Sequence, residues 1–185
     1  MLVAGPQDRA VLLPAISTAT LFADRIRAFA ATAPAAVSTA WPLANDAYLL
    51  PFEVGFPMLV KEIFFQTGTL PGTANFDLGI YDEGFARIIS LGATACVNTT
   101  DAIMPAGGGD IADVTLTRGR YYIAMSAAAI TITVRAVAPA NGLVRAMGVV
   151  KMAAAYPLPP TITPVSMGTT AFMPVMGIAT VTNLL

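Results

Sequence analysis

The chain has 185 residues, of which 56% are hydrophobic and 11% are charged, and its formal net charge is -1. This length predicts one domain with arms, or at most two small domains, and the near-neutral charge predicts no binding of nucleic acid. Ordinary soluble domains carry roughly a quarter charged residues. The composition therefore predicts that part of the surface is buried against other chains.

The residue types present also limit the chemistry. The chain has no histidine and one cysteine, Cys96, which excludes Ser-His-Asp and Cys-His nucleophiles, HExxH metal sites and an intramolecular disulfide. Its uncharged stretches are broken by proline or are too short for a spanning helix, so no membrane segment is expected. The amino-terminal residues lack the basic start of a signal peptide.

Residues 1–38 are predicted to form an amino-terminal arm or short helix. Phe22, Ile26 and Phe29 recur at helical spacing, with serine and threonine ahead of them as caps and Pro34 as a stop. The alternative is an extended arm throughout, because the segment is short and rich in threonine.

From Trp41 onward the sequence consists of short runs rich in β-branched and aromatic residues, separated by Gly, Pro, Asn and Asp. These runs span residues 47–54, 58–68, 75–82, 86–97, 111–117, 120–127 and 129–137. In the last run the aliphatic side chains are expected to face the core: Ile130, Ile132 and Val134. The residues between them are expected to face outward: Thr131, Thr133 and Arg135. The pattern predicts an all-β, antiparallel β-sandwich over residues 39–150, in a jelly-roll-like arrangement.

Some glycines and carboxylates are candidate site residues. Gly84 and Gly119 follow strand ends and are expected to form hairpin turns, and Gly107 to Gly109 lack the lysine of a phosphate-binding loop. A surface calcium site is conceivable on acidic residues that lie close in sequence: Asp77, Asp82, Glu83, Asp110 and Asp113. A glycosidase pair could be drawn from Glu53, Glu62 and Glu83. Neither set has a diagnostic spacing, so no catalytic residue, cofactor or metal is predicted.

Aromatic residues support one alternative to a purely structural function, namely sugar binding. Trp41, Tyr121 and Tyr122 could stack on a sugar ring, with Trp41 as the leading candidate for stacking. In the competing interpretation Trp41 closes one end of the sandwich and the two tyrosines point to its opposite faces.

The carboxyl-terminal segment, residues 151–185, is predicted to be an extended assembly segment. No charged residue follows Lys151, and five prolines prevent a continuous helix. We expect its apolar side chains to pack against a neighbouring subunit in a homo-oligomer, with a trimer favoured. The alternative is that the segment folds back on its own sandwich. The expected interface residues are Tyr156, Leu158, Ile162, Phe172, Met173, Val175 and Met176.

Four stretches, in this order, resemble a β-sandwich module of virion proteins from tailed bacteriophages. They are a Tyr-x-x-Pro-Phe strand, a Leu-Gly-Ile-Tyr-Asp hairpin, a Gly-x-Tyr-Tyr strand and a Pro-Leu-Pro segment, and the resemblance covers roughly residues 39–165. The matching residues are Tyr48, Pro51 and Phe52; Leu78, Gly79, Ile80, Tyr81 and Asp82; Gly119, Tyr121 and Tyr122; and Pro157, Leu158 and Pro159.

The resemblance implies a non-enzymatic structural component of the virion, present in many copies and in contact with other capsid or tail proteins. A capsid decoration protein and a tail or fibre protein both fit this family, and residues 1–38 lie outside the similarity. The alternative function is a carbohydrate-binding module that recognises a host surface glycan. No nucleic acid or membrane partner is expected.

Overall fold

A computed structural model describes residues 11–12, 36–97, 100, 103–104, 110–138, 144, 146–167 and 171–179. In these ranges the regular secondary structure is β-strand with almost no helix, and every strand pairing is antiparallel. No helix in the described part is long and apolar enough to cross a membrane. The short helix predicted near Phe22 falls outside the described residues.

The largest sheet has seven strands in the order β13-β12-β3-β10-β5-β6, with β7 paired to β5. Its central strands, β3, β10 and β5, are also its longest, because their β-branched and aromatic residues suit a pleated surface that is covered on both sides. The strands are β13 (Val165–Ser166), β12 (Val150–Met152), β3 (Ala47–Val54), β10 (Gly119–Ala127), β5 (Asn75–Asp82), β6 (Arg87–Ser90) and β7 (Thr94–Ala95).

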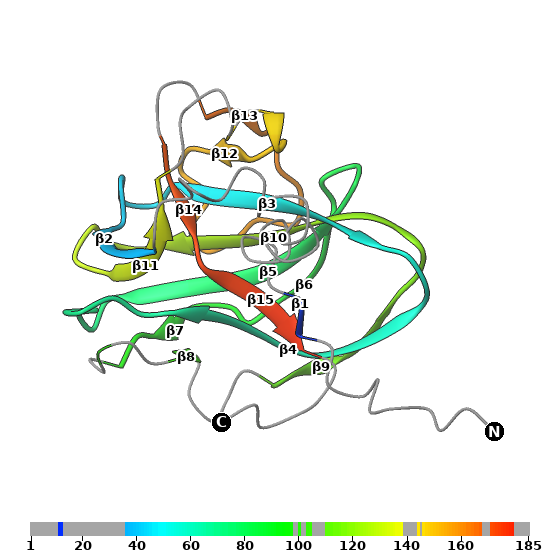
Figure 1. Cartoon of the computed structure of the whole chain (residues 1–185), viewed down its shortest axis with the longest axis horizontal. Coiled ribbons are helices and arrows are strands. Elements are labelled where there is room, and N and C mark those ends of the chain that lie inside the picture. Colours follow the sequence, from blue (N-terminus) through cyan, green and yellow to red (C-terminus); the bar gives the residue numbers. More distant parts are fainter. Residues whose placement is uncertain are drawn as a thin grey trace, which may run out of the picture.

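A five-stranded sheet has the order β1-β15-β4-β8, with β9 paired to β4, and a three-stranded sheet has the order β14-β11-β2. Figure 1 shows β15 and β4 in a layer below β3, β10 and β5. The five-stranded sheet contains β1 (Val11–Leu12), β15 (Met176–Ala179), β4 (Met58–Gln66), β8 (Ile103–Met104) and β9 (Asp110–Leu116). The three-stranded sheet contains β14 (Met173–Pro174), β11 (Thr133–Val137) and β2 (Val37–Ala40).

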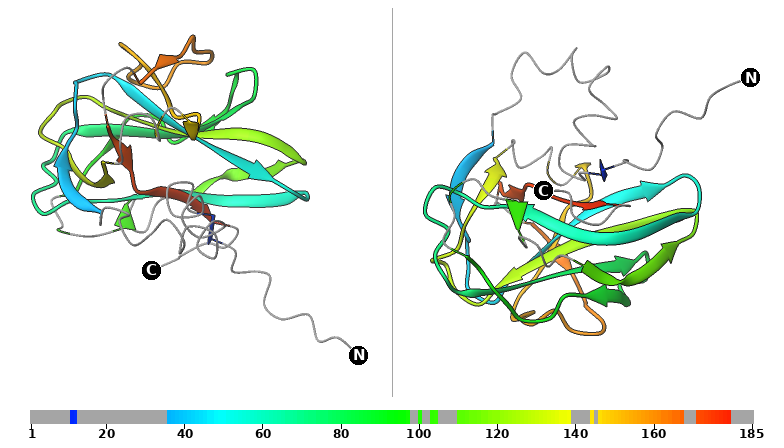
Figure 2. Two further views of the ribbon diagram at one scale, coloured as in Figure 1. Left: turned by 45° about the horizontal axis from the view of Figure 1, so that its top comes forward. Right: turned by 90° about the horizontal axis from the view of Figure 1, so that it is seen from below.

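Two neighbouring chain reversals connect the large sheets at one end of the molecule (Figure 2). The chain passes from β3 into β4 and later from β9 back into β10, and the two connections lie side by side. Val54 pairs with Gly119 on one side of the bend and Met58 pairs with Leu116 on the other. The pair β3–β4 thus forms one bent ribbon with β9–β10, which explains why strands far apart in sequence share both sheets.

The core lies between the sheets and takes alternate side chains of the central strands. Tyr48, Leu50 and Phe52 of β3 point into it, as do Ile123 and Met125 of the adjacent β10, and all are buried. The described residues therefore form an antiparallel, sandwich-like all-β fold.

Two of the predicted strands differ from those observed. The run 86–97 is split into β6 and β7 around Gly92, whose φ of 75° turns the chain. The run 129–137 contains only β11 as a strand, and it begins at Thr133. Ile132 and Val134 are buried as expected, but Ile130 is 54% exposed in the turn before the strand. The inward orientation predicted for Ile130 is wrong, because the alternation of a strand does not extend into the preceding turn.

This difference gives a matched pair of substitutions. Ile132→Ala should lower the free energy of unfolding by about 2–5 kcal/mol, since it removes a fully buried side chain from a packed core. Ile130→Ala should change it by less than about 0.5 kcal/mol. Urea unfolding of the two variants tests the assignment, and equal losses of stability would contradict the register of β11.

The carboxyl-terminal segment belongs to the same fold. Strand β12 pairs with β3, β14 with β11, and β15 with β4. Of the residues expected at a subunit interface, Tyr156 is half-buried and the other six are buried within their own chain. They are Leu158, Ile162, Phe172, Met173, Val175 and Met176. The prediction that these side chains face a neighbouring subunit is therefore corrected: the sandwich needs them to complete its own core.

Candidate functional site

An extended segment covers the outer face of the seven-stranded sheet, the face turned away from the five-stranded sheet. We call residues 155–162 the strap. Its Leu158 and Ile162 side chains are buried against β3, β10 and β5. The sheet residues beneath the strap form a second apolar cluster: Ala47, Leu49, Tyr81, Tyr122 and Ala124.

Polar groups of β5 and β6 hold the backbone of the strap. Prolines at 157, 159 and 160 have no N–H, so within residues 157–160 only Leu158 supplies a backbone donor. The Leu158 N–H donates to Asp77 Oδ2 at 2.9 Å. The Tyr81 hydroxyl donates to the Pro159 carbonyl at 2.6 Å, and the Arg87 guanidinium donates to the Leu158 carbonyl.

Two backbone contacts extend this attachment. The Arg87 N–H donates to the Pro160 carbonyl at 2.7 Å, and the Ile162 N–H donates to the Phe85 carbonyl at 3.2 Å. Phe85 adopts a φ of 63°, which is unfavourable for a non-glycine residue. Its ring lies 4.7 Å from that of Tyr122, between centroids, so this ring contact and the hydrogen bond from Ile162 stabilise the conformation.

The strap can approach the sheet because β5 has a glycine beneath it. A Cβ atom on Gly79 would lie 2.7 Å from the Ile89 carbonyl oxygen and 3.0 Å from Leu158 Cδ1. Any larger residue would have to displace β6 or the strap. Gly79 is therefore needed for close packing, which the sequence pattern alone did not reveal.

Asp77 is the buried carboxyl of this site. Burial raises the pKa of Asp77 above its ordinary value of 3.8, and this effect exceeds the opposing influence of nearby backbone amides and of the Arg87 charge. Burial likewise raises the pKa of Tyr81, so its hydroxyl remains a hydrogen-bond donor at neutral pH. Asp77, Tyr81 and Arg87 together bind the extended backbone of the strap.

The raised pKa of Asp77 predicts how stability depends on pH. The folded state binds this proton more tightly than the unfolded state, so the contribution of Asp77 to stability increases as the pH falls from neutral through the raised pKa. The gain is complete below the unfolded value. Asp77→Asn keeps an oxygen acceptor for the Leu158 N–H but has no titrating proton. Chemical unfolding from pH 4 to 7 should therefore show the variant gaining stability relative to the wild type as the pH rises. Identical pH profiles would contradict this assignment.

The structure excludes Trp41 as an exposed sugar platform. The side chain is 1% exposed, and its Nε1 donates to the Asp46 carbonyl at 3.1 Å. Its ring makes edge contacts with Tyr48 and Phe172 at centroid distances of 5.1 and 5.3 Å. The interpretation that Trp41 closes one end of the sandwich fits this burial.

The two tyrosines are also buried, and they point to opposite faces of β10. Tyr121 packs against Phe52 in the central core, with ring centroids 5.8 Å apart. Tyr122 lies under the strap. Neither side chain presents an exposed ring face to a ligand.

The candidate carboxylates lie on different parts of the fold. Glu53 is exposed on β3, Glu62 is buried on β4 and Glu83 is exposed in the turn after β5. Asp113 is exposed and pairs with Lys61 at 3.2 Å. Among the described residues, no group of three or more acidic, histidine or cysteine side chains could hold a metal ion. Gly107 to Gly109 and the side chain of Asp110 fall outside the described residues.

The strap site itself was not predicted from the sequence. One signal was available, because Asp77 places a charged residue between the apolar residues Phe76 and Leu78 of β5. No family model, curated protein or solved structure matches this chain. Its function is therefore inferred from its own residues.

Proposed function

We propose that this chain is a non-enzymatic structural subunit of a tailed-phage virion, present in multiple copies on the capsid exterior or on the tail or fibre. The observation that supports it is the arrangement of the four stretches that resemble the virion module. Although they are widely separated in sequence, they lie on adjacent strands β3, β10 and β5 and on the strap that crosses them.

The residues of these stretches contact one another directly. In the backbone register Tyr121 pairs with Phe52 of the first stretch and Tyr122 pairs with Tyr81 of the second. The Tyr81 hydroxyl then binds the Pro159 carbonyl of the last stretch. Such mutual contacts are expected of one structural module and are not expected of unrelated strand patterns that happen to occur in order.

The bent ribbon of β3–β4 with β9–β10 supports the jelly-roll-like form of this proposal. Jelly rolls are built from long antiparallel ribbons that fold over so that nested strand pairs enter two facing sheets. The short chain and the compact fold favour a decoration or adaptor role over a complete fibre. Assembly as a homo-oligomer, with a trimer favoured, remains part of the proposal.

The proposal is tested in particles of the phage whose genome encodes the chain. Quantitative mass spectrometry of gradient-purified particles should detect the protein in many copies per particle, and a replication protein of the same phage serves as the absent control. A gene that lies among capsid genes would favour the capsid exterior, and a gene that lies among tail genes would favour the tail or fibre. Absence from purified particles would contradict the proposal.

The two competing functions have their own tests. Saturable binding on a glycan array would favour the carbohydrate-binding alternative, although Trp41 and the tyrosines are not available to provide it. Turnover of peptidoglycan or capsular polysaccharide that is lost on substitution of Glu53, Glu62 or Glu83 would contradict a non-enzymatic role.

A further inference from the structure

The end of the sandwich opposite the β3–β4 turn is formed by loops that are joined to one another. They are the β2–β3 loop (41–46), the β4–β5 loop (67–74), the residues after β7 (96, 97 and 100) and the β10–β11 loop (128–132). Asn45 N–H donates to the Ala127 carbonyl at 2.8 Å, and the Thr100 hydroxyl donates to the Thr69 carbonyl at 2.7 Å. The Thr69 N–H donates to Ser38 Oγ of β2 at 2.9 Å. We call these loops and β2 the uncharged end.

Large apolar side chains are exposed in each part of the uncharged end. Five of the nine exposed large hydrophobic residues in the described chain belong to it, and Leu70 is 74% exposed. Exposed apolar groups that gather on one surface, instead of being scattered singly, are typical of interaction sites. The five residues are Val37, Leu43, Leu70, Val97 and Ile130.

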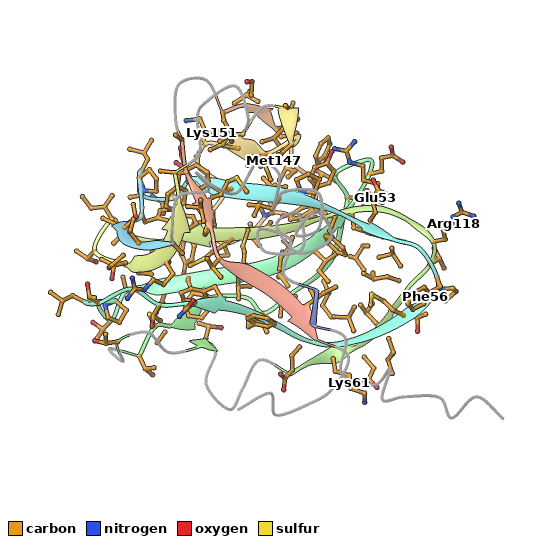
Figure 3. The ribbon with its side chains drawn as sticks, in the orientation of Figure 1. Glu53, Phe56, Lys61, Arg118, Met147 and Lys151 are labelled. Atoms are coloured by element: carbon orange, nitrogen blue, oxygen red, sulfur yellow. The ribbon has the colours of Figure 1, made fainter. Side chains whose placement is uncertain are left out.

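Few charged side chains occur in the described part of this surface. Among the described residues of these loops and β2, the one charged side chain is Asp46, which is buried with its carboxylate 3.5 Å from Lys151 Nζ. Arg135, in the adjoining strand β11, is half-buried. The opposite end carries Glu53 and Arg118, both exposed, beside Phe56 (Figure 3).

The scarcity of charge on this surface suits a contact between two copies of the same chain. When identical surfaces meet around a symmetry axis, each charge near the axis lies close to its own equivalent, so a surface of one charge sign repels itself. An uncharged apolar surface avoids this cost. Of the 26 residues in the uncharged end, 19 are not buried, which is close to the roughly 20–30 that each partner contributes to an interface of standard size.

We infer that copies of this chain contact one another through their uncharged ends. The contact places the apolar loop residues against those of the neighbour and leaves the charged end, with Glu53, Phe56 and Arg118, directed away from it. This inference rests on the proposed multi-copy role, but it is tested on the purified full-length protein and not on virions.

Sedimentation velocity and light scattering measure the oligomer mass of variants that each carry one new charge, either in the uncharged end or at the opposite end. Leu70→Asp should reduce the full-length oligomer to monomer, and Ile130→Asp should do the same from a different loop. Phe56→Asp is the matched control, because Phe56 is also a loop residue and is 65% exposed at the opposite end. It should leave the oligomer mass unchanged. Circular dichroism checks that all three variants are folded.

Charge complementation identifies the partner as the same surface. Leu70→Asp and Leu70→Lys should each be monomeric alone and should associate when mixed, since opposite charges then meet across the contact. A wild-type protein that is still monomeric at a concentration of about 50 μM would overturn the inference, because the dissociation constant would then be well above the micromolar range. So would a Leu70→Asp oligomer, or a Phe56→Asp monomer. None of these outcomes would affect the detection of the protein in particles, so the two proposals fail separately.

Discussion

Deletion of residues 171–185 is expected to abolish folding. The deletion removes β14 and β15, and with β15 one of the antiparallel partners of β4. Burial of one large apolar side chain contributes about 1.5–3 kcal/mol, so the loss amounts to on the order of 10 kcal/mol, comparable with the whole stability of a domain. The buried side chains removed are Phe172, Met173, Val175, Met176 and Ile178.

Circular dichroism and sedimentation of the truncated protein measure this effect. The expected result is loss of the cooperative unfolding transition, together with aggregation. Val165→Ala serves as a mild control in the same part of the sequence, since Val165 is exposed in β13, and it should change stability by less than about 0.5 kcal/mol. A folded, monomeric truncation product would show that the segment serves assembly and not the core.

The second large effect is expected from Trp41→Ala. The side chain joins β2 to the core through its ring contacts with Tyr48 and Phe172, whose own rings lie 4.9 Å apart. Removing a buried tryptophan leaves a cavity that the surrounding rings cannot fill, so the free energy of unfolding should fall by about 3–5 kcal/mol.

Urea unfolding tests this directly, and Trp41→Phe, which keeps an aromatic ring, should lose less stability. An unchanged unfolding midpoint in Trp41→Ala, combined with loss of binding on a glycan array, would instead restore the sugar-stacking function of this residue. The two interpretations of Trp41 therefore predict opposite pairs of results.

Local patterns predicted the central strands because neighbouring residues determine strand propensity and alternation. The expected ranges of β3 and β5 agree with the observed ones, and β4 and β10 differ by only a few residues. The pattern could not show where a strand begins after a turn, so Ile130 was placed in the core. Short strands such as β12 and β14 lack enough residues for a periodic signal.

The carboxyl-terminal segment shows a second limit. Its apolar residues predicted burial correctly, but composition does not specify whether the covering surface belongs to the same chain or to a neighbour. One feature of β3 predicted that both faces of this strand are covered. Residues 47–50 are all apolar and do not alternate, as expected of a strand covered on both faces. The strap supplies the second cover, and Asp77, Tyr81 and Arg87 hold it in place.

Hydrogen exchange of the full-length protein at two concentrations, below and above its association midpoint, tests the central claim most directly. That claim is that the carboxyl-terminal strands complete the chain's own core, while the uncharged end forms the contact between copies. The amides of β15 should be equally protected at both concentrations, and those of residues 67–74 and 128–132 should gain protection only at the higher one. Protection of β15 that disappears on dilution, with no change in the loops, would contradict the account.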